Sequence, residues 1–339
     1  MTESPTDSQR WWLLPVLFLL AIALLLIPPQ VRADDLEEMH IERYAADGRY
    51  GIVASGEGLL GTAVGDIELD VPGASVKAAY LYWSGTANLG DGDDTVTLAR
   101  DGQIVAQSIT ADPVTATYGP EFWFDGFYYF VWLADVTEYV EVGDHIYTVS
   151  NFGYTMRRRD GVGLIVVYED PALPISRVAI KDGLDRFYRN WGNNPRGETA
   201  VNCATFEPQP IDRDMEYWLF LGEINAGEEP RPNALWYLSG TEQEIMPTDL
   251  VNAPTDGPIT GILIQGPPNY PFSSADDPQW DTYEGVVTLP AGHSWLCLQV
   301  ESARDGDYRP ASGMWLLTAG RVQALGPTDV SVAKADYPD

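Results

Sequence analysis

The stretch "VKAAYLYWSGT", residues 76–86, carries the strongest strand pattern in the chain. Aromatic residues favour strands, and side chains alternate between the two faces of a strand. One face would carry Val76, Ala78, Tyr80 and Tyr82, and the other Lys77, Ala79, Leu81 and Trp83. Because both faces are largely apolar, the pattern is typical of a central strand covered on both sides. The stretch therefore predicts the inside of a β-sandwich rather than an exposed binding face.

Similar strand patterns follow along the chain, separated by clusters of Gly, Pro, Asp and Asn. They include "GDIELDV" (65–71), "TVTLAR" (95–100), "DHIYTVSNF" (144–152) and "GVGLIVVYED" (161–170). Asp101-Gly102 has the turn chemistry of a tight hairpin. No long segment beyond the N-terminal region keeps a helical period. The sequence predicts an all-β protein of antiparallel, jelly-roll-like β-sandwich modules.

The second half of the chain loosely repeats the first, which predicts two modules in tandem. "AYLYWSG" (79–85) resembles "EYWLFLGE" (216–223), "VGDHIYTVSN" (142–151) resembles "PAGHSWLCLQ" (290–299), and "RRDGVGLIVVY" (158–168) resembles "YRPASGMWLLT" (308–318). The stretch "RFYRNWGNNPRGE" (186–198) has no strand pattern and is expected to be a linker or surface loop. The expected modules are therefore residues 34–185 and 199–339.

The N-terminus has the layout of a secretory signal peptide. Arg10 precedes an apolar run from Trp11 to Ile27, and a proline break and Ala33 follow. We expect cleavage after Ala33, so that residues 1–33 are removed. An uncleaved N-terminal anchor is the alternative, because the apolar run is close to the length that spans a bilayer. In either case the rest of the chain is expected outside the cytoplasm, as a secreted or cell-surface protein.

The net charge limits which partners the chain is expected to bind, and the cysteines indicate what bond an exported chain would form. The formal net charge is −30, which disfavours binding to nucleic acid and to anionic membranes. We expect no membrane insertion of the mature chain. The two cysteines, Cys203 and Cys297, would form a disulfide in an exported chain, and two buried free thiols are the alternative.

An ordered series of motifs resembles a known bacterial module. The series is "VKAAYLYWSG", "ADVTEYV" (134–140), "YTVSN" (147–151) and "GVGLIVVYEDPALPISRVAIKDG" (161–183). It resembles a β-rich domain of unknown function found in bacterial secreted and cell-surface proteins, over about residues 75–184. The resemblance implies an extracellular β-sandwich and no established catalytic residues.

No hydrolase motif stands out in the sequence. A Gly-x-Ser-x-Gly elbow is absent, and no His or Cys pair has zinc-ligand spacing. His145 and His293 each begin an expected strand, where a histidine is commonly a hydrogen-bonded turn residue. Carboxyl pairs such as Asp182 and Asp185 could serve a glycoside hydrolase. Since the chain has 50 acidic residues, such pairs also arise by chance.

Three loop features remain as candidate ligand sites. The acidic loop with Asp91, Asp93 and Asp94 has the oxygen-rich, glycine-containing character that suits a structural Ca²⁺, although solvated turn carboxylates are the simpler interpretation. Loop aromatics could stack on sugar rings or form a small core, and the candidates are Trp123, Tyr128, Tyr188 and Trp191. The basic run 157–159 could pair with the acidic second module, bind an anionic glycan, or be a solvated hairpin tip.

These observations favour a non-catalytic protein over an enzyme. We expect a structural, adhesive or glycan-binding role, with a cell-surface glycan or a second copy of the chain as partner. The alternative is an extracellular carbohydrate-active hydrolase of tandem jelly-roll form.

Overall fold

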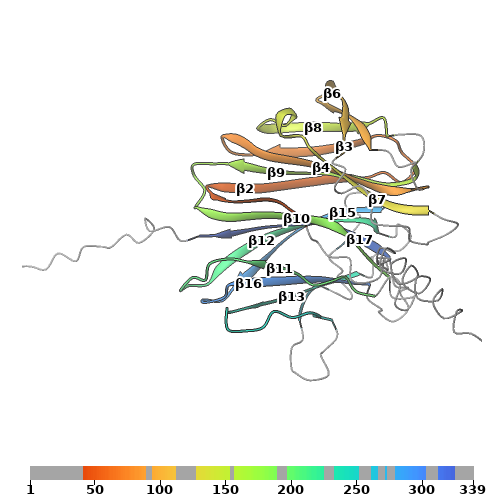
Figure 1. Cartoon of the computed structure of the whole chain (residues 1–339). Helices are drawn as coiled ribbons and strands as arrows, with labels where there is room; N and C mark the ends of the chain where they lie inside the picture. The colour runs from red at the N-terminus through yellow and green to blue at the C-terminus, as the bar shows by residue number, and fades with distance from the viewer. Residues whose placement is uncertain are drawn as a thin grey trace, which may run out of the picture.

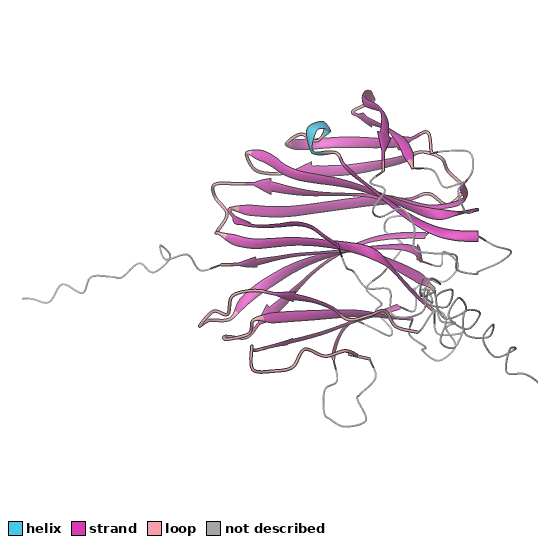
Figure 2. Cartoon of the chain, viewed as in Figure 1, coloured by secondary structure: helices cyan, strands magenta, loops and turns pink. Residues whose placement is uncertain are grey.

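A computed structural model describes residues 41–88, 94–111, 127–152, 156–188, 197–224, 233–251, 261–265, 272, 279–302 and 312–324. Within them the fold is built from antiparallel strands, and a single short 3-10 turn spans Thr137–Tyr139 (Figure 2). The all-β, sandwich-like prediction is confirmed. Among these residues no helix is long and apolar enough to cross a membrane.

The strands form four sheets that stack as layers (Figure 1). Outer sheet 1 has the order β3-β8-β5-β6, and inner sheet 1 has the order β2-β9-β4-β7. Inner sheet 2 has the order β1-β10-β17-β12-β15, and outer sheet 2 has the order β11-β16-β13-β14. Each outer sheet packs on the inner sheet of the same number, and the two inner sheets pack on each other.

The strand order repeats with a period of eight strands. The first unit contains β2 (Tyr50–Gly58), β3 (Gly65–Val71), β4 (Ser75–Asn88), β5 (Thr95–Arg100), β6 (Gln103–Thr110), β7 (Phe127–Asp135), β8 (Gly143–Ser150) and β9 (Met156–Glu169). The second contains β10 (Ser176–Phe187), β11 (Asn202–Thr205), β12 (Arg213–Ile224), β13 (Asn233–Gly240), β14 (Ile262–Gln265), β15 (Gln279–Leu289), β16 (Trp295–Ser302) and β17 (Gly313–Gln323). Adding eight to each strand number of the first unit gives the sheet orders of the second. The extra strand β1 (Ile41–Gly48) lies at the edge of inner sheet 2.

The strand order groups β10 with the second unit. The first unit ends with β9 and the second begins with β10, so the units meet at residues 170–175. The expected linker, residues 186–198, begins with the last two residues of β10 and ends before β11. The expected bounds, residues 34–185 and 199–339, remain a prediction, and in the sequence β10 continues the preceding strand series. Only its pairing with β17 assigns it to the second unit.

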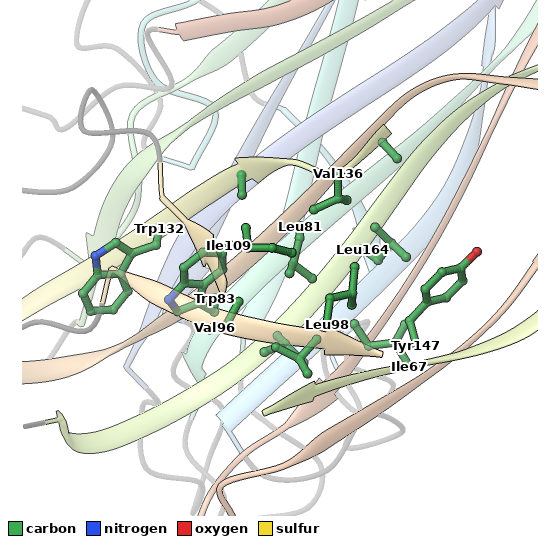
Figure 3. Packing of buried hydrophobic residues seen from close by; sticks show 14 of the residues in the cluster. Ile67, Leu81, Trp83, Val96, Leu98, Ile109, Trp132, Val136, Tyr147 and Leu164 are labelled. Carbon is green, nitrogen blue, oxygen red and sulfur yellow. The ribbon is translucent and has the colours of Figure 1, made fainter. Parts of the chain in front are cut away.

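The opening stretch forms most of β4, a central strand with both faces buried. Leu81 and Trp83 point into the core between outer and inner sheet 1 (Figure 3), and Ala79 belongs to the same core. Ala78 and Tyr82 point into the interface between the inner sheets. In the first core the rings of Trp83 and Trp132 stack with centroids 6.3 Å apart. The stretch is therefore interior, as its two apolar faces predict.

Glycines let the two inner sheets approach closely around one tryptophan. A Cβ atom on Gly56 would lie 2.3 Å from the Trp280 indole nitrogen, and one on Gly163 would lie 2.6 Å from its ring. Gly161 has a similar clearance of 2.6 Å from Trp280 Cβ. Trp280, on β15, is fully buried and also packs against Phe220 at 5.4 Å. The glycines of β2 and β9 thus form a socket that holds Trp280, which we call the glycine socket.

The disulfide prediction is confirmed. Cys203 on β11 lies directly opposite Cys297 on β16, and the two are bonded. The bond joins β11, a short edge strand of outer sheet 2, to its neighbour β16.

Removing the disulfide should destabilise the second unit. A cross-link of this kind limits the freedom of the unfolded chain, and its loss commonly costs about 2–4 kcal/mol. The double variant Cys203→Ala/Cys297→Ala should therefore unfold at lower urea concentration than the parent chain. Adding a reductant should lower the midpoint of the parent and leave that of the double variant unchanged. Equal midpoints for parent and variant would contradict the expectation.

Candidate functional site

The most distinctive chemistry among the described residues is a pair of buried carboxyl groups between the inner sheets. Asp160 on β9 is 0% exposed and Glu223 on β12 is 7% exposed. Each occupies a β-bulge: Asp160 is the extra residue opposite Ser84 and Gly85, and Glu223 is the extra residue where β12 pairs with β15. A bulge can redirect a side chain out of the normal alternation.

One arginine links the two carboxyl groups. Arg158 Nε lies 3.7 Å from Asp160 Oδ1, and its Nη1 lies 3.8 Å from Glu223 Oε1. The Arg158 side chain is 35% exposed, so it covers the pair on the solvent side. In this way the basic run 157–159 contributes an ion pair to the second unit, one of the alternatives left open by the sequence.

Hydroxyl groups complete the cluster. The Tyr129 hydroxyl donates a 3.0 Å hydrogen bond to Glu223 Oε1, and Ser84 Oγ donates a 3.3 Å bond to Asp160 Oδ2. The Arg186 guanidinium lies over the Tyr129 ring, 5.4 Å from its centroid. We call Ser84, Tyr129, Arg158, Asp160, Arg186 and Glu223 the acid cluster.

The backbone around Glu223 is adapted to this position. Glu223 has a φ of 52°, in the left-handed region that residues other than glycine rarely adopt. The preceding Gly222 allows close approach, because a Cβ there would lie 2.7 Å from Ser84 Oγ. Local strain of this kind persists only where surrounding contacts hold it in place.

Burial changes the acidity of the pair. Desolvation raises the pKa of Asp160 to about 6, although Arg158 and Ser84 act in the opposite direction. Desolvation, with the added repulsion of Asp160, raises the pKa of Glu223 to about 8. The same burial raises the pKa of the Tyr129 hydroxyl. Near neutral pH the cluster therefore retains a proton that an exposed carboxyl pair would have lost.

A second polar group lies in the same interface. Asp182 on β10 accepts a 2.6 Å bond from Arg43 Nε and a 2.9 Å bond from the Tyr82 hydroxyl. Asp185 instead accepts a 2.7 Å bond from the backbone of Ala200. Separate partners therefore engage Asp182 and Asp185.

The candidate loop residues lie mostly outside the described residues. Of the acidic loop, Asp94 is described and exposed, whereas Asp91 and Asp93 are not described. Among the aromatic candidates, Tyr188 is half-buried directly after β10, and the side chains of Trp123, Tyr128 and Trp191 are not described. The calcium site and the sugar-stacking aromatics remain predictions. Across the described ranges, no three His, Cys, Asp or Glu side chains are grouped to hold a metal ion.

The two described histidines are hydrogen-bonded, as their turn positions suggest. His145 Nδ1 lies 2.7 Å from Asp101 Oδ2. His293 Nδ1 lies 2.9 Å from Ser239 Oγ. Each histidine thus has a local structural partner.

Sequence reasoning missed the acid cluster. The signal that could have indicated it is a carboxyl residue next to glycine inside an otherwise apolar strand, as in "DGVGL" (160–164) and "LFLGEI" (219–224). Pattern alone could not bring the two together, because Asp160 and Glu223 belong to different units and meet only through sheet packing.

A family model described as "Protein of unknown function (DUF3344)" matches residues 44–217, just over half of the chain. The chain belongs to the DUF3344 family. The match contains the region whose motifs resemble a domain of unknown function, and it runs from β1 into the start of β12. The DUF3344 region therefore includes the whole first unit and part of the second.

Other comparisons add little to the DUF3344 assignment. No curated protein sequence matches the chain. The T13 IBDV viral particle is 9% identical, covering 87% of this chain and 72% of that chain at a TM-score of 0.26. The ANXUR2 extracellular domain from Arabidopsis thaliana is 10% identical, covering 86% and 90% at a TM-score of 0.21. At such TM-scores neither structure supports an argument about the DUF3344 chain.

Proposed function

We propose that the chain is a non-catalytic secreted or surface-displayed protein with a structural or adhesive role, and that its partners include cell-surface glycans. One observation supports this proposal most: the acid cluster is enclosed between the inner sheets. Its carboxyl groups contact Arg158, Tyr129 and Ser84. A catalytic carboxyl pair instead has to flank a cleft that admits the substrate. Charge also supports partners other than nucleic acid or anionic membrane.

A carbohydrate-active hydrolase is the second candidate, and the raised pKa values of Asp160 and Glu223 are the observation that favours it. Carboxyl groups with pKa values near neutrality are common at acid–base catalytic sites. Burial in a purely structural cluster raises carboxyl pKa values in the same direction, so the hydrolase needs evidence of cleavage.

Glycan binding followed by a cleavage assay separates the two candidates. The chain should be applied to a glycan array, and each bound glycan incubated with it and analysed by mass spectrometry. We expect glycans to be bound and left intact. Cleavage that is abolished in Asp160→Asn or Glu223→Gln, but kept in the exposed control Glu68→Gln, would establish the hydrolase and refute the non-catalytic role.

A further inference from the structure

A narrow apolar slot lies inside the second unit, between inner sheet 2 and the edge strand β11. Its volume is about 40 Å³, enough for a small aliphatic group. The walls are mostly apolar and include Ala179, Ala204, Phe206, Leu296 and Val322. A cavity with such walls favours an apolar occupant over water.

The register between β10 and β17 explains why the slot is unfilled. On the floor, Arg177 pairs with Val322, then Ala179 with Gly320, and then Lys181 with Thr318. The middle pair is the smallest, which leaves the space unfilled.

Hydrogen bonds close the far end of the slot. Lys181 Nζ donates a 2.8 Å bond to the backbone oxygen of Cys203, and Asn202 Nδ2 donates a 3.2 Å bond to Thr318 Oγ1. Both bonds join inner sheet 2 to β11, so an occupant has to enter past Arg177 and Val322.

The open end leads into a wider cavity of about 630 Å³, which shares Arg177, Thr205, Phe206 and Val322 with the slot. We call this cavity the mouth. Its acidic residues outnumber its basic residues, with Asp47, Glu207, Glu242 and Glu244 against Arg177 and Arg213.

Both guanidinium groups of the mouth are already engaged. Arg177 lies 3.3 Å from Asp47. Arg213 donates to the backbone oxygens of Gln323 and Glu207 and lies over the Phe206 ring. The side chains of Glu207 and Glu242 are exposed, and Arg213 engages the backbone oxygen of Glu207, not its carboxylate. The mouth therefore favours a cation.

We propose that the slot and its mouth dock a basic segment of a partner polypeptide, with one aliphatic side chain in the slot and Lys or Arg side chains beside Glu207 and Glu242. A second copy of this chain fits poorly, because two chains of net charge −30 repel each other. The inference rests on the proposed adhesive role and names a partner for it.

Short labelled peptides at 150 mM salt test the two halves of this site. A peptide of alternating leucine and lysine supplies both features, an alanine–lysine peptide lacks the aliphatic group, and a leucine–glutamate peptide lacks the cation. Fluorescence polarisation should show the leucine–lysine peptide binding at least about tenfold more tightly than either control peptide. Binding of the alanine–lysine peptide with equal affinity would overturn the assignment of the slot.

Two variants locate the binding on the protein. Ala179→Leu should fill the slot and weaken leucine–lysine binding about tenfold, while the unfolding temperature stays the same or rises. Glu207→Gln/Glu242→Gln should weaken binding in a chain whose slot is unaltered. The matched control Glu68→Gln/Asp70→Asn makes the same charge change on exposed positions of β3.

An equal loss of peptide affinity in both double variants would show that net charge alone drives binding, and it would refute the site. Full binding by a folded Ala179→Leu chain would refute it as well. Neither outcome bears on glycan cleavage, so the docking site and the non-catalytic function can fail separately.

Discussion

Glu223→Gln is expected to leave stability nearly unchanged at pH 5 and to increase it at pH 9. At pH 5 the buried carboxyl is protonated and resembles the neutral amide in shape. At pH 9 the parent chain has to carry a buried negative charge close to Asp160, and the variant does not. Tyr129 can donate to the amide oxygen as it donates to Glu223 Oε1.

The direction follows from proton binding in the two states. Desolvation raises the pKa of Glu223 to about 8 from an ordinary value of 4.5. Between these values the folded chain keeps a proton that the unfolded chain releases, so stability falls as pH rises. The stability that the folded chain gains by keeping the Glu223 proton is complete below about pH 4 and is lost by about pH 8. It should amount to roughly 2 kcal/mol or more.

Urea unfolding of parent and variant at pH 5, 7 and 9 measures this difference. The control Glu68→Gln removes an exposed carboxyl of β3, and its stability relative to the parent should not reverse with pH. A Glu223→Gln chain that is less stable than the parent at pH 9 would show that the ionised carboxyl is a favourable partner of Arg158. Burial would then not be the dominant influence on the Glu223 carboxyl.

Trp280→Ala is expected to lower the free energy of unfolding by about 3–5 kcal/mol, because it empties a socket that glycines cannot fill. The side chain is fully buried, and its neighbours Gly56, Gly161 and Gly163 have no side chains with which to occupy the space. Chemical unfolding would measure the loss. The half-buried Trp236 on β13 provides a control of the same residue type, and Trp236→Ala should cost clearly less.

A double-mutant cycle tests the socket more directly. Gly163→Ala would place a Cβ 2.6 Å from the Trp280 ring, closer than real contacts allow, so it should destabilise the parent chain by about 1–3 kcal/mol. In the Trp280→Ala background the same change should cost less, because the Trp280 ring is gone and the Phe220 ring, 2.8 Å from the added Cβ, can shift into the vacated space. Additive effects would mean that the glycine and the tryptophan do not act together.

Much of the fold could be predicted from local sequence patterns, and the limits have a physical cause. The two apolar faces of β4 indicated burial on both sides, and both are buried. The cysteine pair indicated a disulfide, which joins β11 to β16. Each of these inferences needs only the periodicity or the count of residues within the sequence.

Features that depend on pairing between distant strands escaped prediction. The pairing of β10 with β17 is one such feature, because nothing local in the sequence distinguishes β10 from the strands before it. The acid cluster escaped because bulges redirect Asp160 and Glu223, and a bulge depends on the partner strand. The calcium loop and most of the loop aromatics remain predictions.

The position of β1 limits the order in which the strands can pair during folding. During synthesis β1 emerges before every strand of either unit, yet its partner is β10, and Arg43 on β1 contacts Asp182 at a separation of 139 residues. Until that distant segment appears, β1 has no strand with which to pair. The order in which the strands emerge is therefore not the order in which they can pair, and inner sheet 2 can close around β1 only after β10 has been made.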